Sequence, residues 1–315
     1  MSSLKKIERD QRAAELSSVN TIIARLTDDD FLTRLGLESR RDELRSWLED
    51  HAAEPEETTA SAALFFSGDP VIQTRGIQAE FGALAVNKFQ DLITKMMAQE
   101  GGPLAGTGPV PNKSAARLHI TNVTRGSFGF LLEEIEPQGQ ALDTSLKIAV
   151  DNATRLLTAL GEPDEEGFRA VVETVDQRAL TSAQDFFSLM RNNSAKFRLV
   201  AGQSDKSFTA DAIALATDRA NTTRVHTADE RFGGQFLGAL PHAHQFELRV
   251  ITRPDPINGS VDRSIPASDL ARMNRELTNQ DVVATLKVRR VIRNGVTVRE
   301  SFSLVGLERQ GSSIT

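Results

Sequence analysis

The 315-residue sequence contains no cysteine, no tyrosine and a single tryptophan. Without cysteine, the chain can form no disulfide, no thiolate nucleophile and no cysteine-ligated zinc or iron–sulfur site. No apolar run approaches the ~18 residues that cross a bilayer. The first 18 residues, MSSLKKIERDQRAAELSS, lack the apolar segment of a secretory signal. We therefore expect a cytoplasmic protein with no membrane segment.

Local motifs for catalysis or cofactor binding are also absent. The chain has no GxSxG, no HExxH and no GxxxxGK[ST], so the glycine- and proline-rich loop 101–113 is not a Walker phosphate loop. His242 and His244 share one side of an extended segment that a metal could use, but a plain hairpin loop is the simpler interpretation. We expect no cofactor, no metal and no catalytic residue. An enzyme would need a site assembled from distant residues.

Charge is distributed unevenly along the chain. The net charge is −6, which argues against indiscriminate coating of nucleic acid. Residues 221–315 hold 13 Lys and Arg against 10 Asp and Glu, which makes this part +3 and the rest −9. Any contact with nucleic acid is therefore expected in the C-terminal third.

Residues 1–50 are predicted to form a helical arm. An apolar seam with 3-4-3 spacing, typical of coiled coils and helical hairpins, comprises Leu16, Val19, Ile23 and Leu26. Thr27 and Asp28 can cap a second helix. The seam either packs within the chain or serves as a docking or oligomerisation surface. An acidic linker is predicted over 51–61.

Residues 62–222 are predicted to form a mixed α/β domain. The expected order is a strand, a helix from about Gly76, a hairpin over 117–135, three helices from 143 to 191, a strand over 196–202 and a helix over 208–220. The order strand, helix, hairpin, helix, strand indicates a ferredoxin-like layout as one option.

Residues 223–310 are predicted to form a small β-barrel. Three strands, a helix over 266–279 and two more strands joined by Asn294-Gly295 give the order β-β-β-α-β-β. This order is typical of an OB-like barrel, and another small Greek-key or SH3-like barrel would also suit it. The fold class is therefore α+β, with a helical hairpin, a mixed domain and a barrel.

The predicted barrel carries a candidate basic face. If Phe246, Leu248 and Val250 point inward, then alternation puts cations outward on the same strand and on the next hairpin. We expect these cations to share one outer face with little acid: Arg249, Arg253, Lys287, Arg289, Arg293 and Arg299. Such a face could bind single-stranded nucleic acid, contact a protein or only solvate the strands.

Residues 125–134, RGSFGFLLEE, resemble the ribonucleoprotein octamer of RNA-recognition motifs. Arg125, Gly126, Phe128, Gly129 and Phe130 carry the resemblance, and Ser127 is inserted relative to the pattern. The alternative is an ordinary hairpin whose phenylalanines belong to the core. Glu133 and Glu134 are adjacent in the strand and face opposite ways, which does not suit a catalytic pair.

Across the chain, FFSGDPV, RGSFGFLLEE and the GALP…FEL segment make the sequence look similar to uncharacterised bacterial accessory proteins found near antiviral-defence and toxin–antitoxin systems. The resemblance implies a non-enzymatic subunit of a multi-protein assembly, with a protein partner or a homo-oligomer. A nucleic-acid-binding module is the alternative, and an enzyme is the second alternative.

Overall fold

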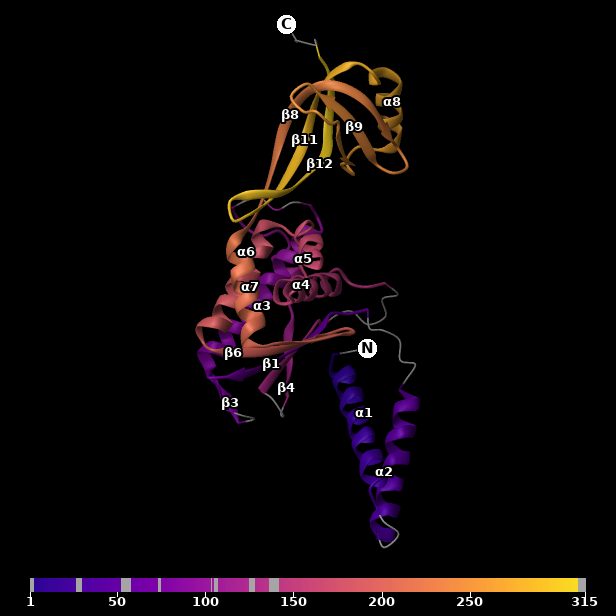
Figure 1. The fold of residues 1–315 in the computed structure, drawn as a ribbon, viewed down its shortest axis with the longest axis vertical. Helices are drawn as coiled ribbons and strands as arrows, with labels where there is room; N and C mark the ends of the chain where they lie inside the picture. Colours follow the sequence, from indigo (N-terminus) through magenta and orange to yellow (C-terminus); the bar gives the residue numbers. More distant parts are fainter. Residues whose placement is uncertain are drawn as a thin grey trace. The chain divides into compact units, whose positions relative to one another are not determined.

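The computed structural model describes residues 3–26, 30–51, 58–72, 75–102, 104, 107–124, 128–135 and 142–310. The chain is a mixed α+β protein, as predicted, and it divides into two compact units, Met1–Asn221 and Thr222–Thr315 (Figure 1). The suggested caps Thr27 and Asp28 lie outside the described residues, as do Arg125, Gly126 and Ser127. None of the helices in the described ranges combines the length and the apolar character needed to cross a membrane.

The first unit contains the helical arm and a five-stranded sheet with its helices. Its elements are α1 (Ser3–Ile23), α2 (Phe31–Asp50), β1 (Ser61–Gly68), β2 (Val71–Ile72), β3 (Gly76–Ile77), α3 (Ala79–Gln99), a 3-10 turn (Lys113–Ala116), β4 (His119–Thr124), β5 (Phe128–Glu133), α4 (Ser145–Gly161), α5 (Glu165–Val172), α6 (Gln177–Asn192), β6 (Ala195–Ala201), β7 (Ser204–Phe208) and α7 (Ala210–Thr222).

The sheet has the strand order β4-β5-β1-β6-β7, and every neighbouring pair is antiparallel. The first strand of the domain, β1, lies between β5 and β6, so the hairpin β4–β5 and the later strand β6 flank it. Six of the eight residues of β1 are buried, because helices cover both faces of this central strand.

One face of the sheet is covered by α3, α4 and α6, which Figure 1 shows gathered on one side. Phenylalanine rings fill this layer: Phe186 contacts Phe89 and Phe197, and Phe197 stacks on Phe208 with 4.2 Å between ring centroids. On the other face, Ile7 of α1 packs into a small cluster with Phe65 and Leu131. The apolar residues of one face are thus covered by a layer of helices, and those of the other face meet the first turns of α1.

The second unit is a closed ring of five strands with one helix. Its elements are β8 (Thr223–Leu240), β9 (Gln245–Val250), β10 (Ile257–Val261), α8 (Ala267–Leu277), β11 (Asp281–Arg293) and β12 (Val296–Arg309). The order around the ring is β10-β12-β11-β8-β9, and β9 pairs with β10 to close it. All contacts between strands are antiparallel except the short parallel pair of β10 with β12.

The core of the ring follows the predicted alternation. Phe246, Leu248 and Val250 are buried on β9, while the residues between them are exposed. The turn between β11 and β12 has positive φ at both Asn294 (49°) and Gly295 (78°), which is the geometry that this dipeptide predicts.

Gly76 and Ile77 form β3, where a helix was expected to begin. Two longer parts of the strands were also not predicted. β7 has the sequence SDKSF, and the first eight residues of β8 are TRVHTADE. Neither shows a clear apolar alternation. The beginning of β8 is held by its long ladder with β11, in which Thr223 faces Arg293 and Glu230 faces Leu286. Pairing with a distant strand, rather than the local pattern, makes this segment extended.

Candidate functional site

The helical arm is a hairpin in which α1 packs along α2. Val19, in the middle of the predicted seam, is buried, and Leu16, Ile23 and Leu26 are half-buried. The guanidinium of Arg40 on α2 donates two hydrogen bonds to the carboxylate of Glu15 on α1, at 2.8 and 3.0 Å. The seam therefore packs largely within the chain, which is one of its two predicted roles.

A second apolar surface lies at the tip of this hairpin, where α1 ends and α2 begins. Its members and their exposed fractions are Ile22 (47%), Phe31 (66%), Leu32 (80%) and Leu35 (56%). We call these four residues the hairpin patch. Soluble surfaces rarely expose contiguous groups of large apolar side chains unless they bind something.

The hairpin patch was missed in the sequence, although a signal was present. At 3.6 residues per turn, Leu35 lies about 160° around the helix from the half-buried Leu37. Phe31 and Leu32 fall on the same outer side as Leu35. A helix that is apolar on two opposite sides at one end has more apolar surface than its hairpin partner can cover.

The predicted basic face is divided by the structure. Arg249 is exposed on β9 and donates a hydrogen bond to the side chain of Gln235 at 3.2 Å. Lys287 lies opposite Asp229 on β8, whereas Arg249 lies opposite Gln235. These β8 positions are six residues apart, which is about 20 Å along a strand.

Arg253 does not continue the alternation of β9, because the strand ends at Val250 and a turn follows. Its guanidinium pairs with Glu300 at 2.9 Å and lies over the ring of Phe302, 5.0 Å from the centroid. Phe302 packs against the core of the ring. The prediction that Arg253 points outward with Arg249 is therefore wrong.

Acidic residues accompany the cations of the hairpin. Lys287 pairs with Asp262 at 3.3 Å. Arg290, which the sequence analysis did not single out, binds Glu230 through two nitrogens and Glu300 at 2.9 Å. The hydrogen bond from Arg290 holds the pKa of Glu230 below its ordinary value. The expectation of a face with little acid is therefore wrong as well.

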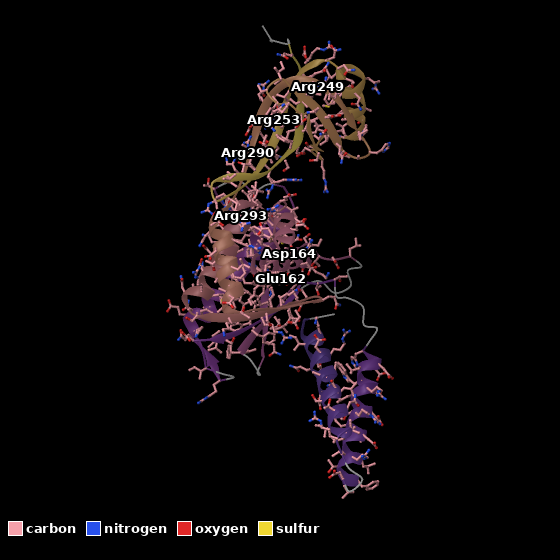
Figure 2. The ribbon with its side chains drawn as sticks, in the orientation of Figure 1. Glu162, Asp164, Arg249, Arg253, Arg290 and Arg293 are labelled. Atoms are coloured by element: carbon pink, nitrogen blue, oxygen red, sulfur yellow. The ribbon has the colours of Figure 1, made fainter. Side chains whose placement is uncertain are left out.

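The remaining predicted cations lie on the same hairpin. Arg289 and Arg293 are half-buried on β11, and Arg299 is exposed on β12. Figure 2 shows Arg249, Arg253, Arg290 and Arg293 spread along the C-terminal unit rather than gathered at one point. No outward aromatic accompanies Arg249 on its strand.

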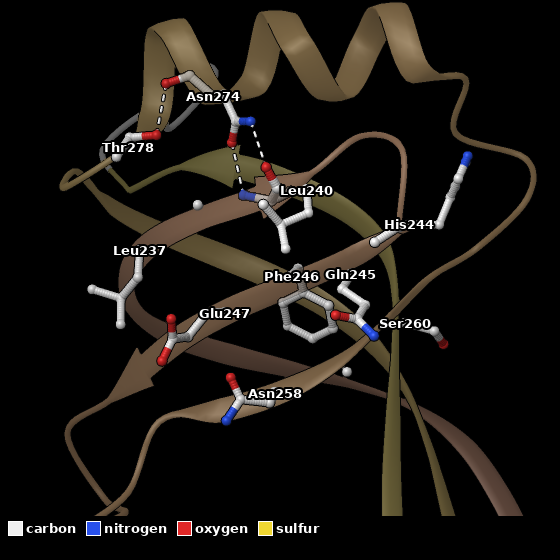
Figure 3. A pocket seen from close by; sticks show the side chains of 14 residues that line it. Leu237, Leu240, His244, Gln245, Phe246, Glu247, Asn258, Ser260, Asn274 and Thr278 are labelled. Atoms are coloured by element: carbon white, nitrogen blue, oxygen red, sulfur yellow. Dashed lines mark hydrogen bonds between the residues drawn. The ribbon is translucent and has the colours of Figure 1, made fainter.

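A groove of about 910 Å³ lies on the outer surface of β8, β9 and β10, beside the end of α8 (Figure 3). The side-chain amide of Asn274 joins α8 to β8 at one side of the groove. It accepts a hydrogen bond from the Ala239 backbone N–H at 2.7 Å and donates one to the Ala239 carbonyl oxygen at 2.6 Å. The loop between β8 and β9 brings His244 to the groove at a φ of 47°.

A cleft of about 480 Å³ in the first unit lies between α4, α5 and the turn from β6 to β7. Its charged side chains are mostly engaged. Glu162 pairs with Lys206 at 2.7 Å, and the Asp164 carboxylate caps α5 by accepting a hydrogen bond from the Glu166 backbone N–H at 3.0 Å. Figure 2 labels both carboxylates. Their partners give them structural roles in the helix cap and the ion pair.

The two phenylalanines of the motif that resembles an RNA-binding octamer lie at the border of the core. Phe128 and Phe130 are half-buried and contact each other at 5.7 Å between centroids. Phe130 also contacts Phe66 of β1. Within the described ranges, no group of three or more His, Asp or Glu side chains could hold a metal ion.

No protein-family model, no curated protein and no solved structure matches this chain.

Proposed function

We propose that this chain is a non-enzymatic, cytoplasmic subunit of a bacterial multi-protein assembly, and that it associates through the hairpin patch. The resemblance to accessory proteins of antiviral-defence systems motivates the assembly role. The observation that carries the proposal is the exposure of four large apolar side chains at one end of the helical hairpin.

The occupant that we propose for the hairpin patch is the same patch of a second copy. No member of the patch is charged, so a twofold contact would bring no like charges together at its centre. The next residue on α2, Gly36, has no neighbouring atom within 4 Å of a side chain built there, which lets a second helix approach closely. Two hairpins packed in this way would form a four-helix contact.

The expected affinity is modest. The exposed parts of the four side chains correspond to roughly 5 kcal/mol of burial per copy, at about 2 kcal/mol for each fully buried side chain. Two copies supply roughly 10 kcal/mol, against an association cost of about 4–15 kcal/mol. At the low end of that cost the surplus is about 6 kcal/mol, which corresponds to a dissociation constant of tens of micromolar, so we expect self-association no tighter than that.

Sedimentation velocity over a range of concentrations tests this proposal. The wild-type chain is expected to shift towards a dimer as its concentration rises, and Leu32→Glu is expected to stay monomeric. Ser46→Glu is the matched control, because Ser46 is exposed on the same outer side of α2 but far from the tip. A wild-type chain that is monomeric throughout, or a Leu32→Glu variant that dimerises like wild type, contradicts the proposal.

We also propose the finer fold assignments. The order β4-β5-β1-β6 with antiparallel pairing supports a ferredoxin-like layout, extended by β7 at one edge. The ring order, with the parallel pair of β10 and β12 and the helix between the third and fourth strands, supports an OB-like barrel.

Nucleic-acid binding by the C-terminal unit is the alternative, and it has less support. Arg253 and Lys287 are paired with acids, and the exposed side of β9 carries no aromatic side chain. Binding of a single strand that weakens steeply with salt, and that Arg249→Glu abolishes, would favour this alternative. For the enzyme alternative, the 480 Å³ cleft in the described part of the chain gives little support, because its carboxylates Glu162 and Asp164 are engaged.

A further inference from the structure

The groove of the C-terminal unit contains an ordered set of polar side chains. Across β9 and β10, Gln245 lies opposite Ser260, and Glu247 lies opposite Asn258. All four are exposed and line the groove. Figure 3 shows Glu247 beside Asn258 and Gln245 beside Ser260. The strand register therefore places two polar pairs in successive rows on one surface.

These four side chains have no hydrogen bond or ion pair with any residue in the described part of the chain. Some long polar side chains of the same unit are engaged, as in the pairs Arg290–Glu230 and Lys287–Asp262. A cluster of amide, hydroxyl and carboxylate groups that do not bind one another is open to a ligand.

The chemistry of the lining selects the ligand. Among the described residues that line the groove, Glu247 is the single Asp, Glu, Lys or Arg, so none of these side chains offers a cation to an anionic nucleic-acid backbone. A carboxylate on an uncharged surface attracts a cationic group. The amides of Gln245 and Asn258 can each donate to and accept from a peptide bond. Leu237 and Leu240 add apolar surface, and Leu240 is 61% exposed.

The spacing also matches an extended peptide. Gln245 and Glu247 are two residues apart on β9 and face the same side, which separates them by about 7 Å. Alternate side chains of an extended peptide repeat at the same distance. Each strand of the ring has a neighbour on both sides, although β10 pairs with β12 at two residues only. The exposed polar groups of the groove lie on the face of β9 and β10, so we place recognition on these side chains.

We infer that this groove binds an extended peptide segment of a partner protein that carries a Lys or Arg next to an apolar residue. Glu247 pairs with the basic side chain, Gln245 and Asn258 bind the peptide backbone, and Leu237 and Leu240 contact the apolar residue. The groove and the hairpin patch share no residue, so a result that contradicts one proposal leaves the other untouched.

Selection from a random-peptide display library on the immobilised full-length chain tests the inference. Enriched peptides are expected to contain Lys or Arg beside an apolar residue. In fluorescence polarisation with a synthetic enriched peptide, Glu247→Lys is expected to weaken binding by roughly tenfold or more, because attraction becomes repulsion. A new peptide selection on the Glu247→Lys variant is expected to enrich Asp or Glu at the peptide position where the wild type selects Lys or Arg. Asn258→Ala is expected to weaken binding without changing the charge preference.

Asp281→Lys is the matched control, because Asp281 is exposed on the same unit but does not line the groove. Asp281→Lys changes the net charge by the same amount as Glu247→Lys and is expected to leave the peptide affinity unchanged. Thermal unfolding checks that each variant is folded, and Leu32→Glu is expected to keep the peptide affinity. The inference is overturned if no peptide is enriched, if acidic peptides are enriched by wild type, or if Glu247→Lys binds the selected peptide like Asp281→Lys.

Discussion

Two adjacent glycines of β8 are expected to respond in opposite ways to the same substitution. Gly233 and Gly234 both avoid positive φ, so an alanine at either position meets no backbone strain. A methyl group on Gly233 would have no atom within 4 Å. A methyl group on Gly234 would lie 2.2 Å from the Arg249 carbonyl oxygen and 3.2 Å from the Val250 Cα. The difference between the two sites is therefore purely steric.

The cost at Gly234 follows from this contact. A carbon atom needs about 3.5 Å from a nonbonded neighbour, so β8 and β9 must separate by more than about 1 Å. The strained pairs are Gly234 with Val250 and Gln235 with Arg249. Overpacking costs about 1–3 kcal/mol, and each weakened hydrogen bond adds about 1 kcal/mol. We expect Gly234→Ala to lower the free energy of unfolding of the C-terminal unit by about 2–4 kcal/mol. Gly233→Ala should leave it unchanged or raise it by about 0.5 kcal/mol.

Differential scanning calorimetry of the full chain measures this difference. For a unit of this size, the expected loss lowers the unfolding temperature by roughly 10–30 °C. The transition of the first unit should not move in either variant. If Gly234→Ala unfolds within a few degrees of Gly233→Ala, then β8 and β9 do not cross as closely as the structure has them, and the argument fails.

Three further predictions concern named hydrogen bonds. The hydrogen bonds from Arg198 lower the pKa of Asp205, so this stabilisation is complete above the unfolded pKa of ~3.9 and is lost as the pH falls through the lower folded value. Asp205→Asn should therefore cost about 1 kcal/mol in urea unfolding at neutral pH and nothing in strong acid; an equal cost at both would contradict the pairing. Asn274→Ala removes both bonds to Ala239 and should cost about 1–3 kcal/mol. It should also speed hydrogen exchange at the Ala239 amide, and unchanged protection there would refute its role. Asp176→Ala removes the cap of α6 and should cost about 1 kcal/mol in thermal unfolding, which Asp176→Asn should restore.

The helices and most strands could be predicted because their signals are local. A period of 3.6 in α4 and α6, the alternation in β9 and the Asn294-Gly295 turn each act within a few residues. The first half of β8 and all of β7 could not be predicted in this way. The first half of β8 is extended because it pairs with β11, which is remote in sequence, and β7 is extended because it pairs with the preceding strand β6 across a tight turn.

The candidate sites depended even more on tertiary structure. Alternation correctly placed Arg249 outward, but it could not show that Arg253 turns back to Glu300 or that Lys287 meets Asp262. These partners are 25 or more residues away in sequence and come together only when the ring closes. The four polar residues of the groove belong to two strands, and only the register of β9 against β10 makes them neighbours.

By itself, the sequence determined the kinds of elements, the inward residues of β9, the tight turn after β11 and the absence of cysteine chemistry, because each is a property of a residue type or of its near neighbours. Only the tertiary structure decided which cations are paired, which of two adjacent glycines must stay a glycine and which leucines on α2 stay uncovered. Those outcomes depend on strand register, on the curvature of the ring and on how much surface one helix can cover.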